Sequence, residues 1–236
     1  MCCFEGEMKV SSYNHACVTY IDILGFKHLV ETVYKDDPAP IDAILDRFSR
    51  EQNTTYGAGL FEQLISHKPT SVLSFSDSIF RITDLPAIET DSKLRVVELS
   101  DNTKETATII SREINVLRKI QHSLATTTTP HSSNDYPGIF IRGGFTIGRI
   151  SFDSDKSRVF GPAVNKSVSL EAGTVDKPNK NPIIVIDADC IRTFDNLFSE
   201  LSKSGAVAKD EEGRLFIDYF TPELLSRIAR GSSLFY

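Results

Sequence analysis

The segment "YIDILGF", residues 20–26, places one acid, Asp22, in an apolar, strand-like stretch that reaches Gly25. A carboxylate that is desolvated in a sheet costs several kcal/mol unless a positive group pairs with it. Asp22 is therefore expected either at the exposed end of a strand or beside a cation. Residues 16–23 alternate and are rich in β-formers, and Gly25 opens a helical stretch to about residue 33. The segment therefore predicts a strand, a tight turn and a helix.

Composition limits the class of protein. The 236 residues are 40% hydrophobic, so we expect a single domain over residues 1–236 with its core at about 14–220. Because 32 Asp and Glu outnumber 26 Lys and Arg, no positive field favours nucleic acid as a partner.

The four cysteines follow no C-x-x-C spacing and no secretory signal is recognisable, so we expect reduced thiols and a cytoplasmic protein. The apolar runs are far shorter than the roughly 20 residues that span a bilayer, so no membrane insertion is expected.

The pattern of apolar residues predicts an α+β fold. Segments 70–75 and 78–83 are strand-like and are joined at Ser76-Asp77, which suits a tight hairpin. A long helix is predicted by one apolar stripe: Ile109, Ile110, Ile114, Leu117, Ile120 and Leu124. Other helices are predicted at 41–65, with a break at Gly57 and Gly59, at 163–172 and at 190–201, and other strands at 139–150, 158–161, 182–187 and 215–220. This order suggests helices packed on one mixed or antiparallel sheet.

Two acids are expected to meet at one end of that sheet. The strand ending near Asp22 can lie beside the hairpin that carries Asp77 at its tip. A single acid at a strand end is more commonly solvated or structural, but two hard oxygen ligands together suit Mg²⁺ or Mn²⁺. Gly25 permits a turn whose backbone N–H groups face a phosphate at the start of the next helix. Acid, glycine turn and helix start together suggest a triphosphate site.

Four blocks of the sequence follow one another between residues 16 and 173: "YIDILGF", "LSFSDSIF", "IRGGFTIGRI" and "VFGPAVNKSVSLEA". They resemble, in the same order, four signatures of the class III nucleotidyl cyclases. These are the Phe-x-Asp-Ile-x-Gly-Phe strand, the Lys-x-x-Gly-Asp hairpin, the Arg-x-Gly-x-x-x-Gly strand and the Trp-Gly-x-x-Val-Asn-x-Ala-x-Arg-x-Glu segment. The last block aligns without a gap at Gly161, Val164, Asn165 and Glu171. The resemblance implies a ferredoxin-like catalytic domain with a central mixed or antiparallel sheet flanked by helices.

The resemblance also implies a metal-dependent reaction. Asp22 and Asp77 would bind two divalent ions, Mn²⁺ or Mg²⁺, with the carbonyl oxygen of Ile23 as a further ligand. One ion would lower the pKa of the ribose 3′-hydroxyl that attacks the α-phosphorus, and the other would neutralise the departing pyrophosphate.

Further site residues follow from the same resemblance. Leu24, Gly25 and Phe26 would cradle the β- and γ-phosphates, and Asn165 would orient the ribose or the reacting phosphoryl group. In this family the acids come from one subunit and the Asn segment from the other. A homodimer with two shared active sites is therefore implied.

Two positions depart from the purine cyclases and concern the base. The Lys four residues before the second acid is Leu73 here, and the position seven residues before Asn165, an acceptor in adenylate cyclases, is Arg158. A guanidinium only donates hydrogen bonds, so Arg158 favours a carbonyl oxygen such as uracil O4 or O2, with guanine O6 or cytosine O2 and N3 as competitors. The alternative for Arg158 is an ordinary surface arginine on an edge strand.

A further departure concerns the chemistry. The family's transition-state Arg, four residues after the Asn, is Ser169 here, and a neutral hydroxyl cannot replace that charge. Lys166, Arg142 or a base from the partner chain are candidates to supply it, and Arg47 and Arg50 are other candidate donors to base or phosphate.

Together these features make the sequence similar to the bacterial pyrimidine cyclases of Pycsar antiphage defence. We expect a uridylate cyclase that converts UTP to cyclic UMP and pyrophosphate, whose product is bound by a cyclic-nucleotide-responsive effector. The alternatives are a cytidylate or guanylate cyclase on the same scaffold, or a catalytically degenerate nucleotide-sensing dimerisation module. Outside this constellation, Asp187 or Asp189, which follow an apolar strand, are expected to cap a helix.

Overall fold

The computed structural model describes residues 14–53, 70–86, 101–126, 138–153, 157–173, 179–222 and 224–226. Its strands are β1 (Asn14–Ile23), β2 (Thr70–Phe75), β3 (Ser78–Asp84), β4 (Ile141–Asp153), β5 (Arg158–Phe160), β6 (Ile184–Ile186), β7 (Val207–Lys209) and β8 (Leu215–Ile217). Its helices are α1 (Phe26–His28), the π-helix η1 (Leu29–Val33), α2 (Ala39–Asn53), α3 (Asp101–Thr126), α4 (Pro162–Ala172), α5 (Ala188–Thr193) and α6 (Asp195–Lys203). The chain contains both helices and strands, and the predicted α+β class is confirmed by the sheet described next.

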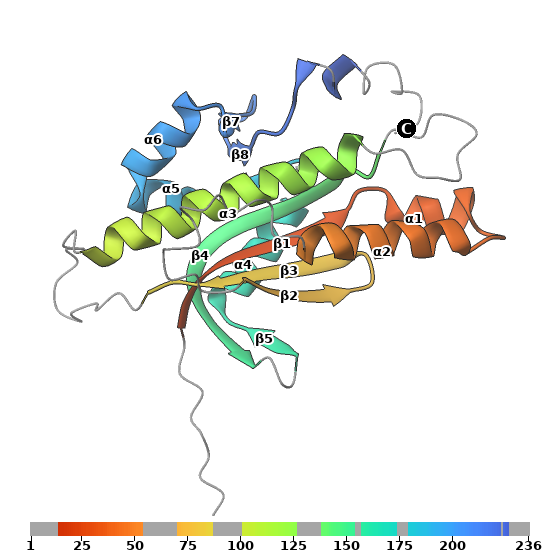
Figure 1. Cartoon of the computed structure of the whole chain (residues 1–236), viewed down its shortest axis with the longest axis horizontal. Helices are drawn as coiled ribbons and strands as arrows, with labels where there is room; N and C mark the ends of the chain where they lie inside the picture. The colour runs from red at the N-terminus through yellow and green to blue at the C-terminus, as the bar shows by residue number, and fades with distance from the viewer. Residues whose placement is uncertain are drawn as a thin grey trace, which may run out of the picture.

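One sheet organises the fold. Its strands are hydrogen-bonded in the order β2-β3-β1-β4-β6-β8-β7, and β5 pairs with the end of β4. The β4–β6 pair is parallel, and the other pairs are antiparallel. β1 therefore lies between β3 and β4, with long strands on both sides (Figure 1). The predicted mixed or antiparallel sheet is confirmed.

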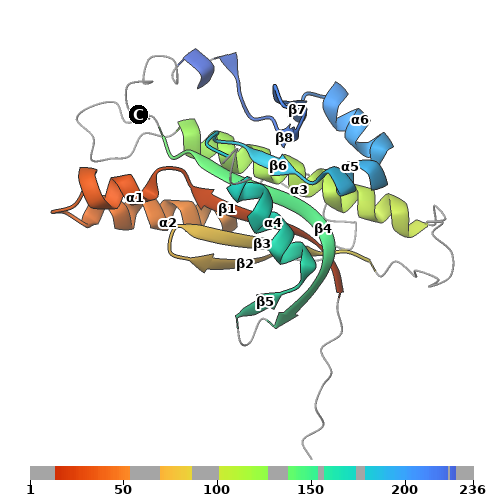
Figure 2. The same cartoon turned by 180° about the vertical axis from the view of Figure 1, so that it is seen from behind.

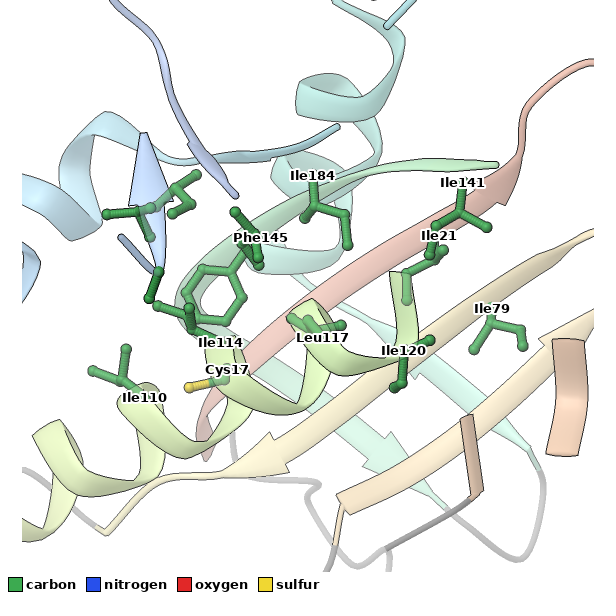
Figure 3. Packing of buried hydrophobic residues seen from close by; sticks show 14 of the residues in the cluster. Cys17, Ile21, Ile79, Ile110, Ile114, Leu117, Ile120, Ile141, Phe145 and Ile184 are labelled. Carbon is green, nitrogen blue, oxygen red and sulfur yellow. The ribbon is translucent and has the colours of Figure 1, made fainter. Parts of the chain in front are cut away.

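The helix α3 covers one face of the sheet (Figure 1). Its apolar stripe, the one predicted from the sequence, packs on side chains of β1, β3, β4 and β6, as Figure 3 shows. Ile114, Leu117 and Ile120 are fully buried there, and Ile44 and Phe48 bring α2 into the same cluster. This is the larger hydrophobic core, and its burial supplies the main stabilisation of the sheet.

The helix α4 packs on the opposite face, over β4 and β1 (Figure 2). Gly144 makes this close approach possible, because a Cβ added there would lie 2.1 Å from the carbonyl oxygen of Ser167 in α4. The pairing of β4 with β1 runs through Gly143 and Gly144 without an extra residue. The two glycines therefore serve close backbone approach, and the strand has no bulge at this point.

Some predicted boundaries were wrong. The helix expected at 190–201 is two helices, α5 and α6, separated at Phe194. β7 was not predicted, and the strands expected at 182–187 and 215–220 are only three residues each. The expected helix break at Gly57 and Gly59 lies outside the described residues.

Gly144→Ala is predicted to destabilise the fold, because its methyl group would overlap backbone atoms of α4 that cannot move independently. We expect a loss of about 1–3 kcal/mol in the free energy of unfolding, measured by urea denaturation. Gly148→Ala is the matched control, since its Cβ would meet the Ala163 Cβ at 3.2 Å, a contact that small shifts relieve. Equal losses in the two variants would contradict this account of the β4–α4 contact.

Candidate active site

The acids Asp22 and Asp77 lie at the same end of the sheet. Asp22 is the penultimate residue of β1, and Asp77 lies in the turn between β2 and β3. Because β1 and β3 are antiparallel, this turn meets the end of β1, where the Ile23 N–H donates to the Asp77 carbonyl oxygen at 3.1 Å. Ser76 allows the tight turn by adopting a left-handed conformation, with φ of 55°. The structure thus brings together the two acids that the sequence suggested as partners.

The Asp22 carboxylate is partly buried and has donors on both oxygens. Oδ1 accepts from Ser78 Oγ at 3.0 Å, and Oδ2 accepts from Arg142 Nη2 at 3.2 Å and Nε at 3.4 Å. Burial raises the pKa of Asp22, and the charge of Asp77 raises it further, while the Ser78 hydroxyl and Arg142 act in the opposite direction. Burial is therefore the main reason why the charged form of Asp22 is disfavoured, and the neighbouring charge of Asp77 adds to it.

Arg142 joins β4 to both neighbouring carboxylates. Its Nε lies 2.5 Å from Glu171 Oε1 on α4, and its Nη1 donates to the Asn179 carbonyl oxygen at 3.0 Å. Burial also raises the pKa of Glu171, although Arg142 lowers it. Arg142, one of the candidates to replace the transition-state Arg, is thus held beside Asp22 and ties α4 to the acid end of β1.

The donor set at this end of the sheet fits a divalent cation. Two carboxylates and the carbonyl at the end of β1 are hard oxygen ligands. Within the described part of the chain, no group of three or more His, Cys, Asp or Glu side chains is arranged to bind a metal ion. Mg²⁺ is commonly held by one or two carboxylates, with water and substrate phosphates completing its coordination. Asp22, Asp77 and Ile23 match that incomplete protein set.

The tight turn predicted after Asp22 is present, and its glycine is left-handed. Gly25 has φ of 77°, and a Cβ there would meet no atom within 4 Å, so backbone conformation rather than space requires glycine. The Leu24 N–H already donates to the Phe140 carbonyl oxygen at 2.9 Å. Of the three residues expected to cradle phosphates, Gly25 and Phe26 are therefore the ones whose N–H groups open the following helix.

Two other expected site residues lie away from the acids of the same chain. In α4, Asn165 is exposed and lies about 9 Å along the helix axis from Glu171, which contacts Arg142. Arg158 is exposed and pairs with Asp153 at the far end of β4, about 36 Å along the strand from Arg142. Figure 2 shows β5 on this projecting end. One chain by itself does not bring Arg158 to Asp22.

The remaining candidate cations have acidic or carbonyl partners. Lys166 Nζ lies 3.5 Å from Asp187 Oδ1, Arg47 Nη2 lies 3.3 Å from Glu51 Oε1, and Arg50 Nε donates to the Asp46 carbonyl oxygen at 3.4 Å. Asp187 also caps α5, accepting from the Asp189 N–H at 3.2 Å, which confirms the expected capping role. Ser169, at the position of the absent Arg, donates to the Asn165 carbonyl oxygen at 2.8 Å.

Sequence reasoning missed two residues that touch this constellation. Ser78 bonds Asp22, and Tyr20 bonds Ser78. Ser78 follows Asp77 directly, and Tyr20 is on the same face of β1 as Asp22, so strand alternation was the available signal. Which hydroxyl meets which carboxylate depends on the β1–β3 register, which the sequence did not specify.

Solved structures with this fold were found. The catalytic core of a rhodopsin-guanylyl cyclase with converted specificity, in complex with ATPαS, superposes with a TM-score of 0.50 at 16% identity, over 87% of this chain and 95% of that chain. A bacterial light-regulated adenylyl cyclase gives a TM-score of 0.51 at 14% identity, over 95% of this chain and 58% of that chain. The chain has the class III nucleotidyl cyclase fold. At these identities the likeness concerns architecture.

Neither a scan of family models nor a search of curated proteins gave a match. Among the described helices, none combines the length and apolar character needed to cross a bilayer.

The raised pKa of Asp22 predicts how its replacement changes stability. The folded chain binds a proton at this carboxyl more readily than the unfolded chain, so this group's contribution to stability falls as the pH rises from its ordinary value of 3.8 through the raised value. Asp22→Asn removes the ionisable group and with it this loss of stability at higher pH. Without divalent ions, we expect the variant to be at least as stable as the wild type at about pH 7 and to lose this advantage toward about pH 4.

Urea denaturation of both proteins at the two pH values measures this difference. The Glu171→Gln variant is the control, because burial also raises the pKa of the Glu171 carboxyl. An Asp22→Asn variant that is less stable than wild type at about pH 7, yet equally stable at about pH 4, would contradict the prediction.

Proposed function

We propose that the chain is a divalent-metal-dependent nucleotidyl cyclase. The observation that carries this proposal is the meeting of Asp22 and Asp77 at the end of β1, in a fold shared with a guanylyl cyclase catalytic core solved with a nucleoside triphosphate analogue. When bound there, divalent ions would lower the pKa of the ribose 3′-hydroxyl and neutralise charge on the leaving pyrophosphate. Asp22, Asp77 and the Ile23 carbonyl would hold the ions, and Gly25 and Phe26 would receive the β- and γ-phosphates.

The complete site would form between two copies of the chain. Asn165 and Arg158 are both exposed and both distant from the acids along their own elements, so a second copy must present them to Asp22. Phe160, on β5 beside Arg158, is 51% exposed and would be covered by a second copy in this arrangement. The homodimer with two shared sites remains the arrangement we propose.

UTP is the proposed substrate. On β2, Leu73 pairs with Phe80, which pairs with Tyr20 of β1, so an apolar row borders the row that contains Asp22. In the row of Leu73, Phe80 and Tyr20, the Leu73 side chain has no hydrogen-bond donor that could read a purine edge. The Arg158 guanidinium of the partner copy would donate to a uracil carbonyl oxygen. The product, 3′,5′-cyclic UMP, would be the messenger that a cyclic-nucleotide-responsive effector binds in antiphage defence within the cytoplasm.

A second candidate function is a nucleotide-sensing dimerisation module without turnover. One observation favours it: Ser169 supplies a neutral hydroxyl, bonded within its own helix, where the family has a transition-state cation. The pair of acids favours the enzyme, because a binding module gains nothing from their mutual repulsion.

The substrate proposal predicts one preferred product. The purified chain with Mn²⁺ and each of the four ribonucleoside triphosphates should form cyclic UMP from UTP, detected by mass spectrometry. Asp22→Ala or Asp77→Ala should lower kcat at least about 100-fold and leave the oligomeric state unchanged. Turnover of ATP alone would overturn the role assigned to Arg158. Nucleotide binding without turnover of any triphosphate would favour the sensing module.

The shared site predicts complementation between two inactive variants. An Asp22→Ala chain and an Asn165→Ala chain should each be inactive by itself. Co-expressed, half of the dimers would be mixed and would hold one intact site, so about one quarter of wild-type activity should return. Asp22→Ala mixed with Asp77→Ala is the matched control, because both lesions then fall on the acid side of a site. No recovery in the first mixture would place Asn165 in the same site as the acids of its own chain.

A further inference from the structure

Two hydroxyl groups lie in series behind the Asp22 carboxylate. The Tyr20 hydroxyl donates to Ser78 Oγ at 2.9 Å, and the Ser78 hydroxyl donates to Asp22 Oδ1 at 3.0 Å. Each hydroxyl has one hydrogen to donate. Ser78 accepts a hydrogen bond from Tyr20 and donates its own hydrogen bond to the Asp22 carboxylate. The direction of both bonds is therefore fixed toward Asp22.

The pairing of β1 with β3 holds this series in place. Asp22 is opposite Ser78 and Tyr20 is opposite Phe80, so all four side chains are on one face of the sheet. The ring centroids of Tyr20 and Phe80 are 4.9 Å apart, which holds the phenol in the position from which its hydroxyl reaches Ser78. Two adjacent cross-strand pairs thus build the whole series.

A carboxylate on a short side chain turns easily about its last torsion, because that torsion has no sharp minima. The Ser78 hydrogen bond selects one orientation and uses only one of the acceptor positions of Asp22, which leaves others open to a cation. Arg142 contacts the other oxygen, Oδ2, so the two donors hold the carboxylate plane from its two oxygens, and among them Ser78 is the one that bonds Oδ1. Partners that orient a metal ligand commonly change metal affinity 10–100-fold when removed.

We infer that Ser78 and Tyr20 are positioning residues that orient the Asp22 carboxylate toward its divalent cation, an inference that rests on the proposed function. The class III signature has Phe where this chain has Tyr20, so the phenol hydroxyl is an addition of this chain. Tyr20→Phe consequently restores the residue that the fold accepts elsewhere and removes only the hydroxyl.

Mn²⁺ binding to the full chain, measured by electron paramagnetic resonance without nucleotide, tests the inference. Ser78→Ala should raise the Kd for Mn²⁺ about 10-fold, and Tyr20→Phe should raise it about 3-fold. Tyr20→Phe added to Ser78→Ala should raise it no further, because the phenol acts only through Ser78. Ser78→Thr, which keeps a hydroxyl at this position, should restore wild-type affinity.

Kinetics with UTP give a second readout. Ser78→Ala should raise the Mn²⁺ concentration needed for half-maximal rate and leave the KM for UTP at saturating Mn²⁺ close to that of wild type. Ser71→Ala, which removes a hydroxyl from β2 opposite Ile82, is the matched control and should change neither quantity. Thermal unfolding by circular dichroism shows whether each variant is folded.

The outcomes separate this inference from the proposed function. If the wild type binds Mn²⁺ and forms a cyclic nucleotide but folded Tyr20→Phe and Ser78→Ala both bind Mn²⁺ normally, the positioning role alone is overturned. If the wild type binds no Mn²⁺ and turns over no triphosphate, both are overturned. If Ser78→Ala does not fold, Tyr20→Phe decides the question, since normal Mn²⁺ affinity in that variant contradicts the series.

Discussion

The antiparallel pairing of β1 with both β3 and β4 fixes where the polar side chains of the site lie. This register places Asp22 between Ser78 and Arg142, and it carries the turn with Asp77 to the end of β1. A slip of one residue would move every β1 side chain to the opposite face of the sheet. The apolar residues of β1 that pack under α3 prevent such a slip, since Cys17, Ile21 and Ile23 would then leave the core.

One arginine serves two carboxylates at this end of the sheet. Arg142 contacts Asp22 on β1 and Glu171 on α4, so a strand that carries a candidate metal ligand and a helix that carries Asn165 share a single cation. Burial of both carboxylates raises their pKa values despite that cation. A divalent ion beside Asp22 would relieve the remaining repulsion from Asp77. The site therefore favours a cationic ligand on electrostatic grounds as well as by the chemistry of its oxygens.

Long or strongly patterned elements were predictable from the sequence. The stripe of α3 and the β2–β3 hairpin were predicted because a helical period and a two-residue turn are local signals. β7 and the separation of α5 from α6 at Phe194 were not, because three-residue strands and single-residue breaks are too short to show a period. Asp77 was placed correctly at the tip of the hairpin because hairpin geometry is local. Its meeting with Asp22, like the Tyr20, Ser78 and Asp22 series, depends on the pairing of β1 with β3, which are distant in the sequence.

The sequence by itself determined the kinds of groups available: the acids, the left-handed glycine at Gly25 and the apolar stripes that build an α+β core. The tertiary structure decided which of those groups meet. It brought Arg142, 120 residues along the chain, onto Asp22, engaged the Leu24 N–H with Phe140, and left Arg158 on the far end of β4. The physical reason is that hydrogen bonding between strands and packing of helices join segments remote in sequence, and no local pattern encodes those pairings.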